Sequence, residues 1–172
     1  PTGAAFAGDY AKFLNTTKKG LDKKDNQELG WIKIKELDVS DIDTLYVKVQ
    51  LPEGVEYHTT ATGTTTSYVY YSDDEGTSES EAPLHSADED TVTVKFTSLA
   101  GFNNDNDYII AYFLTAKGSQ VDISSSAADE IKVTVTVTGV KSGSKVWEES
   151  ATLTVGVIGD KEITVTADTP KS

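Results

Sequence analysis

The chain has 172 residues, contains neither cysteine nor methionine, and carries a formal net charge of −13. All of its strong cations are lysines, and the acidic balance excludes nucleic acid as a partner, because phosphates must be neutralised by Lys and Arg. Disulfides and thiolate metal sites are excluded as well. No apolar run reaches the roughly 18 residues of a spanning helix, so we expect no membrane insertion.

The first 30 residues differ in composition from the rest of the chain. Residues 3–14 are rich in small and aromatic side chains, whereas residues 15–30 are polar and contain four lysines. We therefore expect an N-terminal extension of residues 1–30 and a β domain of residues 31–172. Because the chain starts at Pro1 without methionine, we expect a processed mature form or a trimmed chain. The absence of the oxidation-prone residues Cys and Met, together with strands rich in Thr, Ser, Val and Gly, indicates an extracellular or cell-surface protein.

Within the extension, two kinds of element fit the pattern. A helix would place Phe6, Tyr10 and Phe13 on one stripe. A strand would place Ala4, Phe6, Gly8 and Tyr10 on one face. A segment this short cannot be assigned by its period alone.

From Trp31 onward, apolar and polar residues alternate with a period of two, which is typical of half-buried antiparallel strands. The predicted strands are Trp31–Glu36, Thr44–Leu51, Val55–Ala61, Thr64–Ser72, Thr91–Thr97, Tyr108–Ala116, Ile131–Val140, Val146–Ile158 and Lys161–Thr169. Eight or nine strands at this spacing predict an all-β chain, an antiparallel β-sandwich of the jelly-roll or immunoglobulin-like type.

Turn signals between these strands predict three hairpins. The first turns at Gly63, the second at residues 141–145, and the third at the dipeptide Gly159-Asp160. The strand at Tyr108–Ala116 is apolar on both faces, so we expect it in the middle of the sandwich. The acidic stretch Ser72–Asp90 contains no lysine, and we expect it to be a loop.

The sequence contains no recognisable catalytic motif. Its two histidines, His58 and His85, have no metal-binding spacing, and there is no G-x-S-x-G, H-E-x-x-H or Walker A sequence. Paired carboxylates of the glycosidase kind are not excluded by their number, but scattered surface acids explain them more simply. We therefore expect that the protein is not an enzyme.

Two short motifs are candidate sites for a metal ion and for modification. Asn103, Asp105 and Asp107 bring several oxygens into one loop, which would suit Ca²⁺, although the spacing is not that of an EF-hand. The alternative is an ordinary turn, since Asn and Asp bond their own backbone. Asn15, followed by two threonines, forms an N-glycosylation sequon on a polar stretch. No other cofactor is implied.

Aromatic residues offer a further candidate site. The set comprises Trp31, Trp147, Tyr68, Tyr70 and Tyr71. Such rings could form a platform that stacks on sugars, because they present a large apolar surface with a polar group. Core packing and cross-strand pairing are the alternative use of the same residues.

The small and aromatic N-terminal segment, with its polar spacer, suits a strand that docks into a neighbouring subunit. An acidic, cysteine-free β-sandwich with such a tail resembles the subunits of extracellular filaments built by donor-strand exchange, namely TasA-like matrix fibres, archaeal bundling pili and archaeal threads. The resemblance implies a homopolymer in which Ala4, Phe6, Gly8 and Tyr10 form the donor strand. The long apolar helix of type IV pilins and the cysteines of chaperone–usher pilins are absent.

Two alternatives to a filament subunit remain open. The N-terminal segment could instead cover an edge of its own sheet. The chain would then be a carbohydrate-binding or cohesin-like module of a surface protein, with Trp and Tyr side chains exposed in a planar strip.

Overall fold

The computed structural model describes residues 4–15, 17–118, 120–159 and 163–164. The described part consists of fourteen strands and one short 3₁₀ helix, Thr115–Lys117. It is all-β, which confirms the predicted fold class, with more strands than expected. No helix in these residues is long and apolar enough to cross a membrane.

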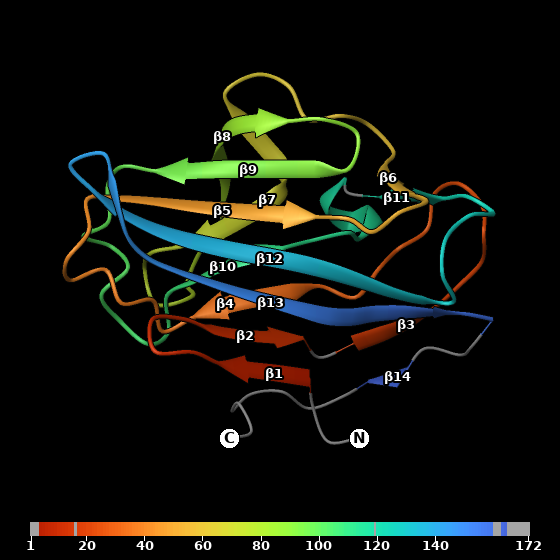
Figure 1. Ribbon diagram of the computed structural model, residues 1–172, viewed down its shortest axis with the longest axis horizontal. Helices are drawn as coiled ribbons and strands as arrows, with labels where there is room; N and C mark the ends of the chain where they lie inside the picture. Colours follow the sequence, from red (N-terminus) through yellow and green to blue (C-terminus); the bar gives the residue numbers. More distant parts are fainter. Residues whose placement is uncertain (1–3, 16, 119, 160–162, 165–172) are drawn as a thin grey trace.

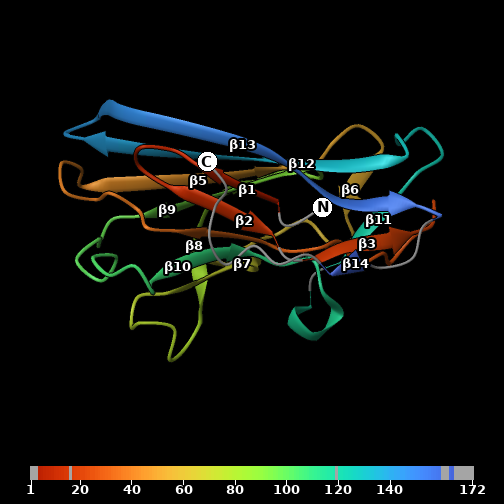
Figure 2. The same ribbon diagram turned by 90° about the horizontal axis from the view of Figure 1, so that it is seen from below.

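Twelve strands form one continuous sheet that curls over on itself into two layers (Figures 1 and 2). In spatial order, the first layer contains β1 (Ala4–Ala7), β2 (Lys12–Asn15), β4 (Ile32–Lys35), β10 (Tyr108–Ala111) and β7 (Thr65–Ser72). The second layer contains β9 (Thr91–Phe96), β5 (Thr44–Gln50), β12 (Glu130–Lys141), β13 (Ser144–Ile158), β3 (Thr17–Leu21) and β14 (Ile163–Thr164). Strand β8 (Ser80–Ala87) pairs with β7 and β9 and so joins the layers.

The period-two pattern decides which side chains enter the space between the layers. In β12, Val133, Val135 and Val137 are fully buried, while the threonines between them are half-exposed. On the solvent side, the Thr136 hydroxyl lies 2.6 Å from the Ser150 hydroxyl of β13. Shifting such a strand by one residue would expose its valines, so burial fixes the register.

The first predicted hairpin is wrong, whereas the pairing of β12 with β13 confirms the second. Strand β6 (Val55–Tyr57) pairs with β11 (Val121–Ile123) in a separate two-stranded sheet and not across Gly63 with β7. Most of the third predicted hairpin, residues 160–162 and 165–169, lies outside the described residues. Its described part, β14, pairs with β3, which lies between it and β13. Turn residues report where the chain bends but not which strand it meets next.

The acidic stretch is not a continuous loop, because its second half forms β8. Only three of the eight residues of β8 are apolar residues packed in or against the core: Ala82 is buried, and Leu84 and Ala87 are partly buried. The strand is specified by its two neighbours, β7 and β9, rather than by its own hydrophobic pattern.

The described residues among the first 30 are hydrogen-bonded to the body of the fold at several points. β1 pairs with β2 and β2 pairs with β4, whereas β3 pairs in parallel with β13 in the other layer. The amide Nδ2 of Asn15 donates to the Thr154 carbonyl at 3.0 Å, and the Gly30 N–H donates to the Val155 carbonyl at 2.8 Å. The division into an extension and a domain after residue 30 stays a prediction.

The two N-terminal phenylalanines provide a matched test of this arrangement. Phe13 is fully buried, so Phe13→Ala should lower the free energy of unfolding by about 3–5 kcal/mol. Phe6 is 41% exposed, so Phe6→Ala should cost less than about 1 kcal/mol. Urea denaturation measures both values. Equal losses for the two variants would contradict the placement of β2 in the core.

Candidate functional site

Four aromatic side chains lie on the first layer, on the face that points away from the core. Trp31 precedes β4, Tyr70 belongs to β7, and Tyr108 and Tyr112 lie on and just after β10. All four are half-buried. We call this set the aromatic strip.

The residue under the strip shows why rings gather on this face. Ile110 of β10 is 1% exposed, yet it does not belong to the core cluster between the layers. Its partners in the ladders are Lys33 of β4 and Tyr70 of β7. Because β10 is apolar on both faces, its outer face must be covered, and the strip supplies the cover.

Two lysines connect the rings by cation–π contacts. The ammonium of Lys33 lies 4.1 Å from the Tyr108 ring centroid and 5.4 Å from that of Trp31. The ammonium of Lys117 lies 4.6 Å from the Tyr70 centroid and 4.8 Å from that of Tyr112. A ring face attracts a cation at such distances, so the lysines hold the rings in a fixed arrangement.

Glu79 lies at the centre of the strip. Its carboxylate accepts hydrogen bonds from the hydroxyls of Tyr108, at 2.7 Å, and Tyr112, at 3.1 Å, and from the Lys117 ammonium, at 2.7 Å. Tyr70 and Tyr112 meet edge to face, with centroids 5.8 Å apart. Charge-assisted bonds of this kind are stronger than neutral ones, so the cluster is preorganised.

The surroundings of these groups shift their pKa values in opposite directions. Burial alone would raise the pKa of Glu79, but the bonds from Lys117 and Tyr108 outweigh it, and the pKa is lowered. Burial, with the Glu79 hydrogen bond and charge, raises the pKa of Tyr108 to about 12. The same causes raise the pKa of Tyr112. At neutral pH the carboxylate is therefore charged and both phenols are neutral.

The five aromatic residues that were weighed as a platform or as core residues divide between these two roles. Trp31 and Tyr70 do belong to the strip. Trp147 is 6% exposed and Tyr68 is 3% exposed, while Tyr71 packs edge to face on Phe96 of the core. Trp147 and Tyr68 are therefore buried, and Tyr71 is half-exposed with its ring against the core, as the alternative of core packing anticipated.

Sequence reasoning missed Tyr108, Tyr112, Lys33, Lys117 and Glu79. The strand alternation of β4 and β10 contained the signal for Lys33 and Tyr108, since both precede or follow buried isoleucines by one residue. Nothing in the sequence brings Glu79 and Lys117, which are 38 positions apart, to the same site.

The residues predicted to form a donor strand lie on β1 and in the turn after it. Ala4 and Phe6 belong to β1, which pairs with β2 of the same chain, and the Phe6 ring lies 5.8 Å from that of Phe13. Gly8 lies in the turn. This placement agrees with the alternative in which the segment covers its own sheet edge, and donation to another subunit stays a prediction.

Tyr10 ties this turn to the second layer. Its ring stacks on Trp147 of β13 with centroids 5.0 Å apart, and its N–H donates to a Glu149 carboxylate oxygen at 2.5 Å. The second Glu149 oxygen packs so closely on Gly8 that any Cβ at this position would collide with it. The turn is therefore built for contact with β13.

The loop predicted to bind calcium is closed by its own hydrogen bonds. Asp107 is buried, and its two carboxylate oxygens accept from the backbone N–H groups of Glu75 and Asn104, each at 2.9 Å. Asn103 and Asp105 are exposed. Across the described residues, no three His, Cys, Asp or Glu side chains gather as a metal site would require. These contacts match the turn alternative, and calcium binding stays a prediction.

Asn15 does not lie on an exposed polar stretch, as the sequon had suggested. Its side chain is fully buried, and its Nδ2 atom, which a glycan would modify, donates to the Thr154 carbonyl. The fold leaves no room for a glycan at this atom. Glycosylation of Asn15 would therefore require a different arrangement of β2.

The contact between Glu79 and the tyrosines can be tested by titration. Tyr108 should ionise near pH 12 rather than near 10, so the stability that its neutral form contributes is complete below pH 10 and is lost as pH rises through 12. In Glu79→Gln the pKa should fall but stay above 10, because burial remains. Ultraviolet phenolate absorbance measures it, with Tyr108→Phe identifying the group. An unchanged pKa in Glu79→Gln would contradict the contact.

No protein-family model and no curated protein matches the sequence. Several solved structures are similar in shape. The collagen-binding subdomain of the Enterococcus faecalis surface protein ACE is 8% identical, with 85% of this chain and 96% of that chain covered and a TM-score of 0.45. The collagen-binding domain of a Staphylococcus aureus adhesin is 10% identical, with coverages of 87% and 99% and a TM-score of 0.44. The sixth cohesin of Acetivibrio cellulolyticus scaffoldin B is 17% identical, with coverages of 85% and 96% and a TM-score of 0.37. At these values the similarities identify no ligand or partner for this chain.

Proposed function

We propose that the chain is a carbohydrate-binding module of an extracellular protein and that the aromatic strip is its binding surface. One observation carries the proposal: four half-exposed rings, two lysines and one carboxylate share the outer face of a single sheet layer. The strip is held in place by its own contacts, so little ordering is required when a ligand binds.

The chemistry of the strip matches that of a sugar chain. The apolar faces of pyranose rings stack on aromatic rings, and phenol, ammonium and carboxylate groups bond the surrounding hydroxyls. A ligand site usually combines an apolar surface with a few fixed polar groups, which is the composition found here.

A neutral sugar fits better than an acidic one. The chain has a net charge of −13, so its field repels polyanions. One of the two strip lysines, Lys117, is already paired with Glu79 at 2.7 Å. An anionic glycan would have to compete with that carboxylate.

Binding without catalysis is the activity that the strip supports. A glycosidase acid needs a carboxyl group with a raised pKa, so that it is protonated near neutral pH. The pKa of Glu79 is lowered instead. Its role is then to position Tyr108, Tyr112 and Lys117.

Removing single rings tests the proposal. Trp31→Ala and Tyr112→Ala should each weaken binding to a neutral glycan at least about tenfold, or about 1.4 kcal/mol, because central aromatic contacts dominate such interfaces. A glycan array identifies the ligand, and isothermal titration calorimetry measures the affinities.

Tyr46→Ala is the matched control for these variants. Tyr46 is a half-exposed tyrosine of the second layer with Lys95 5.7 Å from its ring centroid, but it lies outside the strip. Its variant should bind as the wild type does. A wild type that binds no neutral glycan, or strip variants that bind normally, would refute the proposal.

A second candidate function is self-assembly through the N-terminal strand. Its support is the position of β1, which ends the sheet and, among the described residues, pairs only with β2. Phe6 and Tyr10 are exposed by 41% and 37%. In a polymer, the contacts that β1 makes with its own chain would be made with a neighbouring copy, as in an open head-to-tail assembly.

Deletion of residues 1–7 separates the two candidates. Deleting residues 1–14 would also remove the buried Phe13 and Leu14, so the shorter deletion is the appropriate one. If β1 mediates assembly, the full chain should form filaments in electron micrographs and the deleted chain should not. Monomers of the full chain at high concentration would contradict self-assembly. Unchanged glycan binding by the deleted chain would leave the first proposal intact.

A further inference from the structure

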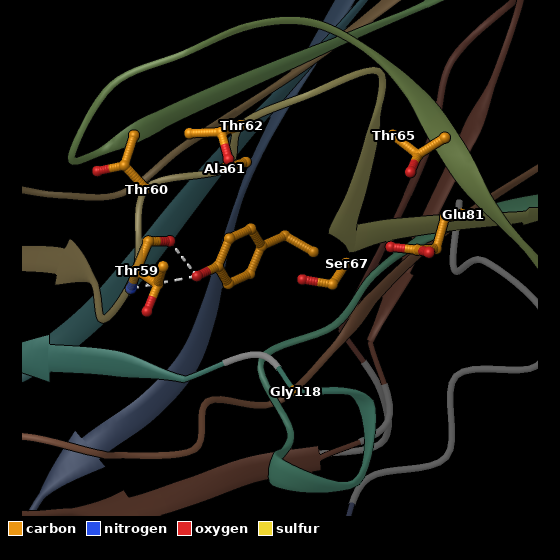
Figure 3. A pocket seen from close by; sticks show the side chains of 9 residues that line it. Thr59, Thr60, Ala61, Thr62, Thr65, Ser67, Glu81 and Gly118 are labelled. Atoms are coloured by element: carbon orange, nitrogen blue, oxygen red, sulfur yellow. Dashed lines mark hydrogen bonds between the residues drawn. The ribbon is translucent and has the colours of Figure 1, made fainter.

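A pocket of about 360 Å³ lies beside the aromatic strip (Figure 3). It is lined by Thr59, Thr60, Ala61, Thr62, Thr65, Ser67, Tyr68, Glu81 and Gly118. We call it the threonine pocket. In Figure 3, Thr60 and Thr62 lie on one side, Thr65 and Glu81 on the other, and the turn at Gly118 below. Its volume lies in the lower part of the range of small-molecule sites, about 300–1,000 Å³.

An irregularity in the β7–β8 ladder creates the pocket. Thr66 is opposite Ala82, but the next pair is Tyr70 with Glu81, so β7 advances four residues while β8 advances one. The extra residues push Ser67 and Tyr68 out of the regular pairing. Bulges of this kind are common next to functional sites, because they redirect side chains.

Tyr68 fixes one wall of the pocket. Its hydroxyl donates to the Thr59 carbonyl and accepts from the Thr59 N–H, at 3.3 Å in the latter case (dashed lines in Figure 3). The buried ring packs at an angle of 42° against Tyr57, with centroids 4.4 Å apart, and this contact holds it in position. The loop that carries the threonines is thereby anchored to the core.

The lining selects a class of ligand. The lining contains six hydroxyl side chains, from four threonines, Ser67 and Tyr68, and one carboxylate, Glu81, but no cation. Hydroxyls both donate and accept, and a carboxylate accepts from two neighbouring hydroxyls. A phosphate, a sulfate or an acidic sugar would meet Glu81 without compensation. A neutral polyol satisfies the lining.

Three direct connections join the threonine pocket to the aromatic strip. Gly118 of the pocket follows Lys117 of the strip, and Glu81 of the pocket is the ladder partner of Tyr70. The Tyr68 carbonyl accepts the Tyr112 N–H at 2.9 Å. Charge adds a fourth link, because Glu81 contributes to the raised pKa of Tyr70, after burial.

The geometry points to a two-part site in which the threonine pocket takes one neutral sugar residue, a chain end or a branch, of a glycan whose other rings stack on the strip. This inference rests on the proposed function. It adds that the glycan must be long enough to reach both the strip and the threonine pocket. Affinity should therefore rise by at least about tenfold from a disaccharide to a hexasaccharide of the same neutral glycan.

The test uses two variants. One combines Thr62→Val with Thr65→Val, and the other carries Glu81→Gln alone. All three residues are exposed, and Val keeps the shape of Thr, so folding is preserved. The control is Thr97→Val, an exposed threonine of the other layer. The probes are di- and hexasaccharides of neutral β-glucan, xylan and mannan, and calorimetry measures binding.

The outcomes separate the pocket from the strip. In both pocket variants the hexasaccharide should lose its advantage while the disaccharide binds as to wild type, and the control should change neither. Wild-type hexasaccharide affinity in the pocket variants, or equal affinities for both lengths in the wild type, would overturn the pocket alone. No binding of any probe by the wild type would overturn the proposed function and this inference with it.

Discussion

The structure depends on filling the space between two layers that belong to one sheet. The layers are joined through β8, which pairs with β7 of the first layer and β9 of the second. The space is closed by residues from the first and last parts of the chain, where Asn15 bonds Thr154 and Gly30 bonds Val155. Each strand must therefore present its apolar set inward, and the polar sets are left to form the outer faces.

The aromatic strip is a consequence of this constraint at one strand. β10 lies inside the first layer and is apolar on both faces, so inward packing of Ile109 leaves Ile110 pointing outward. Covering Ile110 with rings and lysine stems removes it from water while keeping the surface partly polar. A surface that protects the fold in this way also suits recognition, since its groups are already ordered.

Sequence periodicity was sufficient for the fold class and for most strands of the second layer. It worked best in β12, where Val and Thr alternate without interruption, and poorly in β8, whose ladder partners rather than its residues make it a strand. The pairing of strands that lie far apart in the sequence could not be predicted, as the parallel contact of β3 with β13 illustrates. Local sequence patterns indicate which side chains are buried. The pairing partner of a strand depends instead on where the complete fold places the edges of the other strands.

For the same reason, only part of the candidate site could be predicted from the sequence. Trp31 and Tyr70 could be named because rings are conspicuous in a sequence. Their contacts with Lys117 and Glu79 could not, since those residues lie on a 3₁₀ helix and before an irregular strand. The threonine pocket left no signal either, because a ladder irregularity is a property of two strands and the sequence of β7 alone does not contain it.

The parallel pairing of β3 and β13 has a consequence for how the protein folds. Lys19 of β3 pairs with Gly156 of β13, which lies far from it in the sequence. β3 therefore cannot take its place in the sheet before β13 is in position. Folding dominated by such distant partners is slow.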